Sequence, residues 1–245
     1  MTGENAGNEQ ARAILYVGFG RYGEALSLIE GRQDLDAILL RAIAFDQAGR
    51  LFEALDCCSA ALAIAPLDPD AWFIQGRALF HFSEYEQAVR SFEQALRLDP
   101  GYVEAQYLLG NALYALGRLP EAIESYRAVI ARDPLRPKAL YNCGVALADL
   151  GRFDEALRMY DLAIERSGGM PALFTNRGVC LAALDRLPEA IEAFTMAVEI
   201  DPRDHAAWHN RGIAHARLGQ DEAARYCFSR CRALNDRSGS PGMQG

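Results

Sequence analysis

Apolar positions in this chain fall on two helix faces within each stretch of about 34 residues. In residues 68–100 the first face is formed by Trp72, Gly76 and Leu79. The second face is formed by Tyr85, Ala88, Phe92 and Ala95. Spacings of three and four residues predict amphipathic helices, and the short segment between the two faces predicts a turn. Each stretch is therefore expected to be a helix–turn–helix unit.

The same pattern recurs along the chain with a step of 34 residues. The alanine of the second face is repeated at Ala54, Ala88, Ala122, Ala156, Ala190 and Ala224. The glycine of the first face is repeated at Gly76, Gly110, Gly144, Gly178 and Gly212. Tandem repetition at this period indicates stacked repeats, each of which buries its apolar faces against its neighbours.

The glycine inside each first helix needs a structural reason. In mid-helix, glycine is less favourable than alanine by about 0.5–1 kcal/mol. We expect Gly76 to face Ala88 on the second helix, so that two small residues let the helix backbones approach closely. A larger residue would overpack this contact, at a cost of about 1–3 kcal/mol.

The residues of one unit resemble a known repeat. The pattern W-x3-G-x2-L…Y-x2-A-x3-F-x2-A-x4-P, read from Trp72 to Pro100, is similar to that of the tetratricopeptide repeat (TPR), and the resemblance covers about residues 6–236. It implies an all-α fold, a right-handed α-solenoid of about seven helix-turn-helix repeats. It also implies that the first helices line a concave groove that binds peptides.

The period predicts one solenoid over residues 6–236, between a flexible N-terminus at 1–5 and a disordered tail at 237–245. Its repeats are expected at 6–34, 35–68, 69–102, 103–136, 137–170, 171–204 and 205–236. The first repeat is degenerate, because Gly49 follows Gly20 after 29 residues, and its second helix is expected to be short and to end near Gly31. The last repeat is expected to be a solvated cap. Its charged residues, at positions that are aliphatic or aromatic in internal repeats, are Asp221, Arg225 and Arg232.

Composition narrows the class of function. The chain is 51% hydrophobic and carries a formal charge of −8, which argues against a nucleic-acid-binding or polybasic membrane-surface protein. We recognise no signal-peptide pattern and no apolar run long enough to span a bilayer. We therefore expect a cytoplasmic protein.

No catalytic motif is recognisable, so we expect neither an enzyme nor a cofactor or small-molecule substrate. Cys227 and Cys231 have the i,i+4 spacing of metal ligands, as do His205 and His209, but no further ligand completes either set. We favour small buried cysteines and solvated or groove-facing histidines. No metal site is predicted.

Positions 2, 5, 9 and 12 of each first helix form a stripe beside the face that packs on the second helix. The resemblance places this groove stripe on the concave side. With the asparagines beside it, the stripe supplies the candidate peptide-binding residues Phe73, Arg77, Phe80, Tyr107, Asn111, Tyr114, Tyr141, Asn142, Asn176, His209 and Asn210. Exposed aromatic residues favour protein binding, whereas rings packed between neighbouring first helices would belong to the core. Both interpretations stay open.

Asn142, Asn176 and Asn210 recur at the repeat period, one position after the stripe. An asparagine amide both donates and accepts hydrogen bonds, so it pairs with the backbone of any peptide. The spacing resembles the asparagine ladder in the repeats of the O-linked N-acetylglucosamine transferase, which implies an extended bound segment. The alternative is that these amides cap turns or face water.

These observations predict an adaptor or scaffold that binds an extended protein or peptide segment in the groove. The N-terminal part of the groove is expected to be acidic, which favours a cationic segment. Its carboxylates are Asp36, Asp46, Asp70 and Glu104. The alternative is a structural role, as a homo-oligomer in which the first repeat or the groove docks on another copy.

Overall fold

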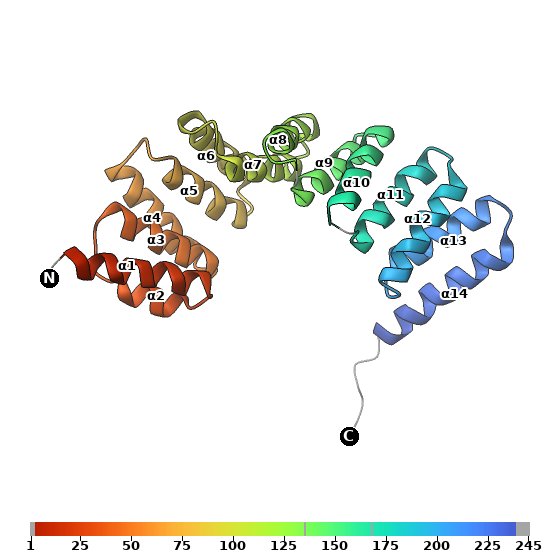
Figure 1. Cartoon of the computed structure of the whole chain (residues 1–245), viewed down its shortest axis with the longest axis horizontal. Coiled ribbons are helices and arrows are strands. Elements are labelled where there is room, and N and C mark those ends of the chain that lie inside the picture. The colour runs from red at the N-terminus through yellow and green to blue at the C-terminus, as the bar shows by residue number, and fades with distance from the viewer. Residues whose placement is uncertain (1–2, 135, 168, 239–245) are drawn as a thin grey trace, which may run out of the picture. The chain divides into compact units, whose positions relative to one another are not determined.

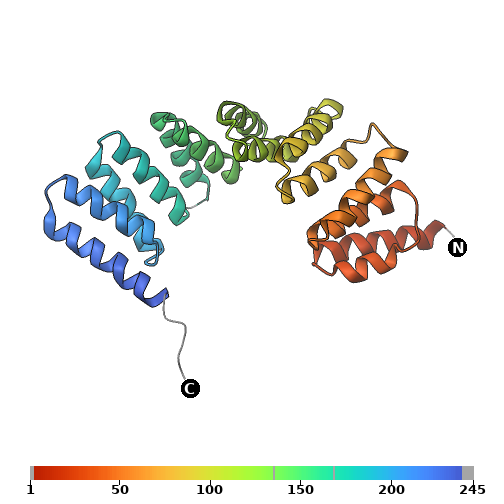
Figure 2. The ribbon, with the colours of Figure 1, turned by 180° about the vertical axis from the view of Figure 1, so that it is seen from behind.

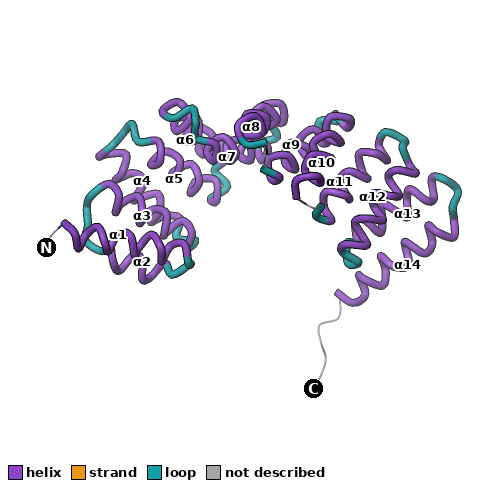
Figure 3. The backbone as a smooth tube through the Cα atoms, in the orientation of Figure 1, coloured by secondary structure: helices purple, strands orange, loops and turns teal. Residues whose placement is uncertain are grey.

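The structure, a computed structural model, describes residues 3–134, 136–167 and 169–238, and all regular structure in these ranges is helical (Figures 1 and 3). The chain divides into two compact units, residues 1–125 and 126–245. Unit 1 contains α1 (Gly3–Gly18), α2 (Tyr22–Leu28), α3 (Leu35–Gln47), α4 (Leu51–Ile64), α5 (Pro69–His81), α6 (Tyr85–Leu98) and α7 (Val103–Ala115). Unit 2 contains α9 (Pro137–Asp149), α10 (Phe153–Ser167), α11 (Pro171–Ala183), α12 (Leu187–Ile200), α13 (His205–Arg217) and α14 (Asp221–Ser238). The division falls inside α8 (Leu119–Arg132).

Within each unit, consecutive helices pack in pairs. In unit 1 the pairs are α1–α2, α3–α4 and α5–α6, and in unit 2 they are α9–α10, α11–α12 and α13–α14 (Figure 2). The first helix of each pair also contacts the first helix of the next, as α1 does α3 and α9 does α11. The chain is thus a helical-repeat solenoid of about seven helix pairs, and its first helices form a continuous face within each unit.

Several first helices begin at an aspartate that satisfies a free backbone N–H group of the first turn. The side chain of Asp68 accepts a hydrogen bond from the Ala71 amide at 2.8 Å. Asp34 and Asp204 cap α3 and α13 in the same way. The equivalent position before α7 is Tyr102, which makes no side-chain cap. Its hydroxyl is used elsewhere, as described below.

The mid-helix glycines face aromatic rings, which corrects the predicted contact between Gly76 and Ala88. A Cβ atom on Gly76 would lie 2.7 Å from the ring of Phe92, sixteen residues further on. Gly144 meets Tyr160 in the same way, at 2.6 Å. Ala88 is buried, but the close approach is between the backbone of the first helix at Gly76 and the ring of Phe92. Helices α5, α9, α11 and α13 therefore need glycine at this position, because an aromatic residue of the same pair occupies the space of a side chain. Helix α3 has Ala42 there, opposite Cys58 where the other pairs have the ring.

The turn inside each pair contains one residue with positive φ, which favours glycine. Gly49, Gly117, Gly151 and Gly219 have φ between 70° and 76°. Ser83 and Asp185 occupy the same position with φ of 62° and 59°. A residue other than glycine in this left-handed conformation costs about 1–2 kcal/mol.

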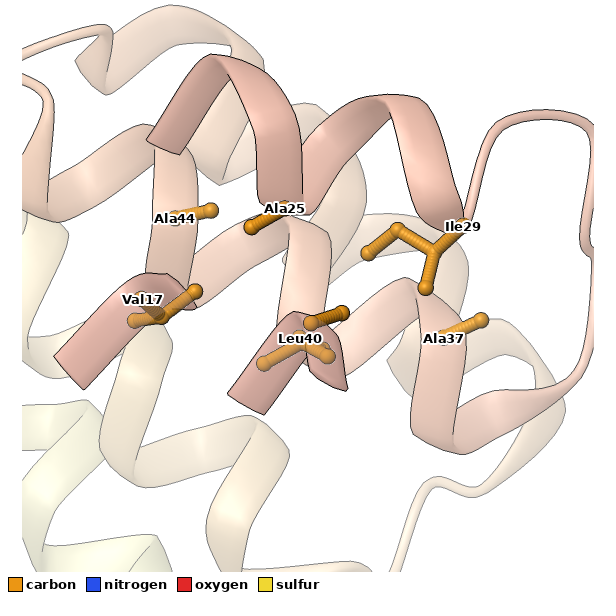
Figure 4. Packing of buried hydrophobic residues seen from close by; sticks show 7 residues of the cluster. Val17, Ala25, Ile29, Ala37, Leu40 and Ala44 are labelled. Atoms are coloured by element: carbon orange, nitrogen blue, oxygen red, sulfur yellow. The ribbon is translucent and has the colours of Figure 1, made fainter. Parts of the chain in front are cut away.

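The first pair is built differently from the others. Its second helix, α2, has only seven residues and is followed by Gly31, which has positive φ. A compact core still joins the pair to α3, with Val17, Ala25, Ile29, Ala37, Leu40 and Ala44 packed together (Figure 4). Helix α1 begins at Gly3, so residues 3–5 are helical although the sequence led us to expect a flexible segment at 1–5.

The last pair exposes charge at the end of the chain. Asp221, Arg225 and Arg232 are all exposed on α14, as expected for a solvated cap. Helix α14 continues to Ser238, so the first two residues of the predicted disordered tail are helical. The rest of that tail, residues 239–245, lies outside the described residues.

Candidate functional site

A cavity of about 450 Å³ opens on the first helices of unit 1. It is bounded by α1, α3 and α5 and by the residue that precedes α7. Its lining residues are Gln10, Ile14, Asp36, Leu39, Leu40, Ile43, Asp70, Phe73, Ile74, Arg77 and Tyr102. The groove stripe supplies Asp36, Leu39, Ile43, Asp70, Phe73 and Arg77. We call this space the unit 1 cavity.

The floor of the unit 1 cavity is apolar. Phe73 is only 7% exposed, and its ring lies 4.8 Å from that of Tyr102 and 6.1 Å from that of Phe92. Leu40 and Ile74 are also buried. Phe73 therefore belongs to the core and lines the cavity at the same time, so the two interpretations of the aromatic stripe both apply to this ring.

One side of the cavity is formed by Arg77, which is held by a buried carboxylate. Asp46 is 3% exposed, and its Oδ2 atom lies 2.6 Å from Nε of Arg77. The Nδ1 atom of His81 lies 2.9 Å from the other oxygen, Oδ1. The arginine Nη2 atom is buried and has no hydrogen-bond partner among the described residues. The predicted role of Asp46 as an accessible acid of the groove is wrong, because α5 covers this carboxylate and uses its charge.

Two carboxylates stand at the rim of the cavity, and both are oriented by neutral groups. The hydroxyl of Tyr102 donates to Oδ1 of Asp70 at 2.7 Å. The side-chain amide of Gln10 donates to Oδ2 of Asp36 at 3.2 Å. Burial, followed by the hydrogen bond to Asp70, raises the pKa of Tyr102 above its ordinary value, so this phenol stays neutral. The donors fix the carboxylates in place without cancelling their charge.

Carboxylates at the start of second helices have charged partners. A glutamate there pairs with an arginine three residues before it, as in Arg118–Glu121 and Arg152–Glu155. The hydrogen bond from Arg118 holds the pKa of Glu121 below its usual range. In contrast, the hydrogen bonds to Asp36 and Asp70 at the unit 1 cavity come from neutral side chains.

The other predicted residues of unit 1 lie along the same face but outside the cavity lining. Phe80 is half-buried, and its ring lies 5.4 Å from that of Tyr85. Tyr107, Asn111 and Tyr114 on α7 are half-buried as well. These residues continue the stripe beyond the cavity, and their part in binding stays a prediction.

In unit 2 the predicted residues lie on α9, α11 and α13. The amide of Asn176 donates to the hydroxyl of Tyr141 at 3.2 Å, which joins the two first helices. Asn142 and Asn210 are half-buried, and His209 is exposed with its ring 5.7 Å from that of Phe228. One rung of the predicted ladder is thus engaged within the protein.

Unit 2 also has a cavity of about 450 Å³, but it lies off the stripe. Its lining comes from α10 and α11 and from Arg186, which precedes α12. Arg177 of this lining pairs with Asp161 at 2.8 Å. Unit 1 has a cavity of about 480 Å³ at the same repeat positions, lined in part by Leu55, Ser59, Gln75 and Leu79, so this off-stripe cavity is common to both units.

Sequence reasoning missed five residues of the unit 1 cavity: Gln10, Ile14, Leu40, Ile74 and Tyr102. The signal for Tyr102 was a tyrosine where Asp34, Asp68 and Asp204 act as helix caps. Gln10 and Ile14 lie in the degenerate first repeat, where the 34-residue register gives no guide to orientation.

The cysteines and histidines form no site in the described residues. Cys58, Cys143, Cys180 and Cys227 are buried, as expected for small hydrophobic residues, and burial raises the pKa of Cys143 to about 11. His215 is buried, whereas we expected a solvated or groove-facing histidine, and its Nδ1 atom lies 2.6 Å from Oε1 of Gln220.

Within the described ranges no group of three metal-binding side chains occurs. No described helix has the length and apolarity needed to cross a bilayer.

Comparison with known proteins identifies the repeat. A family model described as tetratricopeptide repeat matches residues 39–89, 75–137, 107–171, 141–205 and 181–235. Among curated protein sequences, none matches this chain.

Solved structures share the fold. The C-terminal part of a TPR repeat-containing protein from Cytophaga hutchinsonii matches with a TM-score of 0.77 and 15% identity, over 93% of this chain and 95% of that chain. YrrB, described as a TPR protein with an unusual peptide-binding site, matches with a TM-score of 0.67 and 25% identity, over 77% of this chain and 96% of its own. MamA matches with a TM-score of 0.65 and 22% identity, over 66% of this chain and 95% of its own.

Proposed function

This chain belongs to the tetratricopeptide repeat family, and we propose that it is a non-enzymatic adaptor that binds an extended segment of a partner protein on its first helices. The observation that carries the proposal is the unit 1 cavity, where an apolar floor lies open beneath polar groups. Sites that combine an apolar floor with a few placed polar groups are typical of ligand-binding pockets.

The stripe residues have different roles in binding. The apolar floor around Phe73 supplies affinity, because an apolar side chain of the partner leaves water there. Beyond the cavity, the rings of Tyr107 and Tyr114 extend the contact surface. In unit 2, the amides of Asn142, Asn176 and Asn210 pair with the backbone of a bound segment. YrrB, at 25% identity, is a relative in which a peptide-binding site is described.

A pair of neighbouring residues on α1 tests the proposal. Ile14 lines the cavity and is 54% exposed, whereas Leu15 is 58% exposed and lies outside the lining. A random dodecapeptide library displayed on phage is selected on the wild-type chain, and binding of the selected peptides is then measured on Ile14→Asn and Leu15→Asn. We expect Ile14→Asn to raise Kd about tenfold, as loss of one buried aliphatic contact implies. Equal affinities for the two variants would place binding elsewhere and refute the proposal.

Self-assembly is a second candidate, favoured by the outer side of α1. Leu15 on α1 is 58% exposed, and Phe19, the residue after the end of α1, is 75% exposed. If copies associate through this side, light scattering will show a molar mass that rises with concentration, and Leu15→Asn with Phe19→Asn will abolish the rise. A constant monomer mass at all concentrations would exclude this candidate and leave the adaptor proposal untouched.

A further inference from the structure

The geometry points to a specific partner chemistry: the unit 1 cavity takes a peptide segment in which a lysine or arginine stands beside an apolar residue. This inference rests on the proposed function and adds the class of partner to it. Its basis is the balance of charge around the cavity, residue by residue.

The only cation in the described lining, Arg77, is paired with a carboxylate. Asp46 lies against its Nε atom at 2.6 Å and is almost fully buried. A second cation, Arg32, lies outside the lining. Its guanidinium holds both oxygens of Asp34 at 2.8 Å, and its Nη2 atom also donates to Oε1 of Gln10 at 3.0 Å.

The rim carboxylates Asp36 and Asp70 are each bonded to a neutral donor. Gln10 donates to Asp36, and Tyr102 donates to Asp70. A carboxylate accepts about four hydrogen bonds, so one neutral donor leaves room for a cationic ligand. The two residues stand in the first turns of α3 and α5, and both line the cavity. A cationic side chain that enters the cavity therefore finds two carboxylates in its lining.

The floor of the unit 1 cavity takes an apolar side chain of the bound segment. Phe73, Leu40 and Ile74 form this floor and are buried. A cation beside an apolar side chain describes a short basic and apolar peptide.

The first test is the composition of peptides selected from the dodecapeptide library on the wild-type chain, after counter-selection on the Ile14→Asn variant. The inference predicts enrichment of lysine or arginine next to an aliphatic or aromatic residue. Enrichment of neutral or acidic peptides would overturn the inference and leave the proposed function standing. Failure to enrich any peptide over the Ile14→Asn variant would overturn both.

The second test measures how far the rim charges contribute. A synthetic peptide from the selected set is titrated against the Asp36→Asn, Asp70→Asn double variant by fluorescence anisotropy. We expect Kd to rise about tenfold, as loss of two partly exposed ion pairs implies. A matched control, Asp56→Asn with Glu93→Gln, removes the same charge from exposed positions on α4 and α6. If the two double variants raised Kd equally, the effect would come from net charge and not from the rim carboxylates. That result would overturn the inference.

The wild-type chain gives a check that needs no substitution. Raising salt from about 0.05 M to about 0.5 M shortens the screening length below 10 Å and weakens attraction between partly exposed charges. We expect affinity for the selected peptide to fall severalfold over this range. Affinity that does not change with salt would contradict a site built on Asp36 and Asp70.

Discussion

The first helices of the two units share one backbone pattern but carry different side chains at the same repeat positions. The position of Ile43 and Arg77 in unit 1 is taken in unit 2 by Val145, Val179 and Ile213. The position of Asp46 is taken by Ala148, Ala182 and Ala216. The position of Asp36 and Asp70 is taken by Lys138, Ala172 and Ala206.

The comparison distinguishes the residues that set the packing of each helix pair from the stripe residues, which differ between the units. Glycine, alanine and aromatic positions set the packing of each pair, and they are the same in both units. The stripe side chains differ between the units, although some of them, such as Phe73 and His209, also approach aromatic rings of their own second helix. Unit 1 uses this freedom to build an acidic cavity with an apolar floor, whereas unit 2 presents small residues and amides.

The largest expected effect comes from replacing Asp46, because unit 2 has alanine at the same position. Asp46→Ala leaves the Arg77 charge without its buried partner, which should lower the free energy of unfolding of unit 1 by about 3 kcal/mol. The pair Asp46→Ala with Arg77→Val, which copies Ala148 and Val179, should recover most of the loss because no unpaired charge remains.

One tryptophan in each unit allows the free energy of unfolding of that unit to be measured. Denaturant unfolding followed by fluorescence in a Trp208→Phe background reports on Trp72 in unit 1, and the converse background reports on unit 2. A double variant as unstable as Asp46→Ala would show that the ion pair is not the source of the loss. A matching loss at Trp208 would show that the effect is not confined to unit 1.

Replacing the mid-helix glycines should affect both units alike. In Gly76→Ala and Gly144→Ala the new methyl group would meet Phe92 or Tyr160 at under 3 Å. Overpacking should outweigh the gain in helix propensity, and each unit should lose about 1–2 kcal/mol in the same two-tryptophan assay. Gly23→Ala on α2 is the control, since its Cβ would meet nothing within 4 Å, and it should stabilise the chain slightly. A loss in one unit only would contradict a common packing scheme.

The smallest effect concerns the asparagines of unit 2. Changing Asn142, Asn176 and Asn210 together to alanine should raise Kd for a selected peptide about threefold, less than Ile14→Asn does. The effect is small because hydrogen bonds exchanged with water contribute little and Asn176 already pairs with Tyr141. Anisotropy titration measures the change, with helicity by circular dichroism as the control. An unchanged Kd with intact helicity would remove the asparagines from the binding site.

The sequence predicted the architecture because the 34-residue period applies from residue 35 onward. First helices begin at residues 35, 69, 103, 137, 171 and 205, each the first residue of its repeat. Periodicity assigns a residue to a helix face but does not say which atoms meet across helices. For this reason periodicity alone pairs Gly76 with Ala88, whereas the ring of Phe92 lies nearest to it. Periodicity likewise places Asp46 among the groove acids, whereas this carboxylate is buried.

The site was harder to predict because it depends on departures from the repeat. Tyr102 reaches Asp70 because it replaces a capping aspartate, and Gln10 reaches Asp36 from a repeat that lacks the regular register. Periodic reasoning finds positions that every repeat shares. The charge balance of the unit 1 cavity arises from positions that only one or two repeats share.

The central claim is that a partner segment docks in unit 1, and photo-crosslinking tests it most directly. A peptide selected from the library carries a benzophenone group beside its basic residue, and crosslinked positions on the unmodified chain are mapped by mass spectrometry. The account predicts crosslinks on α1, α3 and α5, around the cavity that Asp36 and Asp70 flank. Crosslinks found only on α9, α11 and α13 would contradict it.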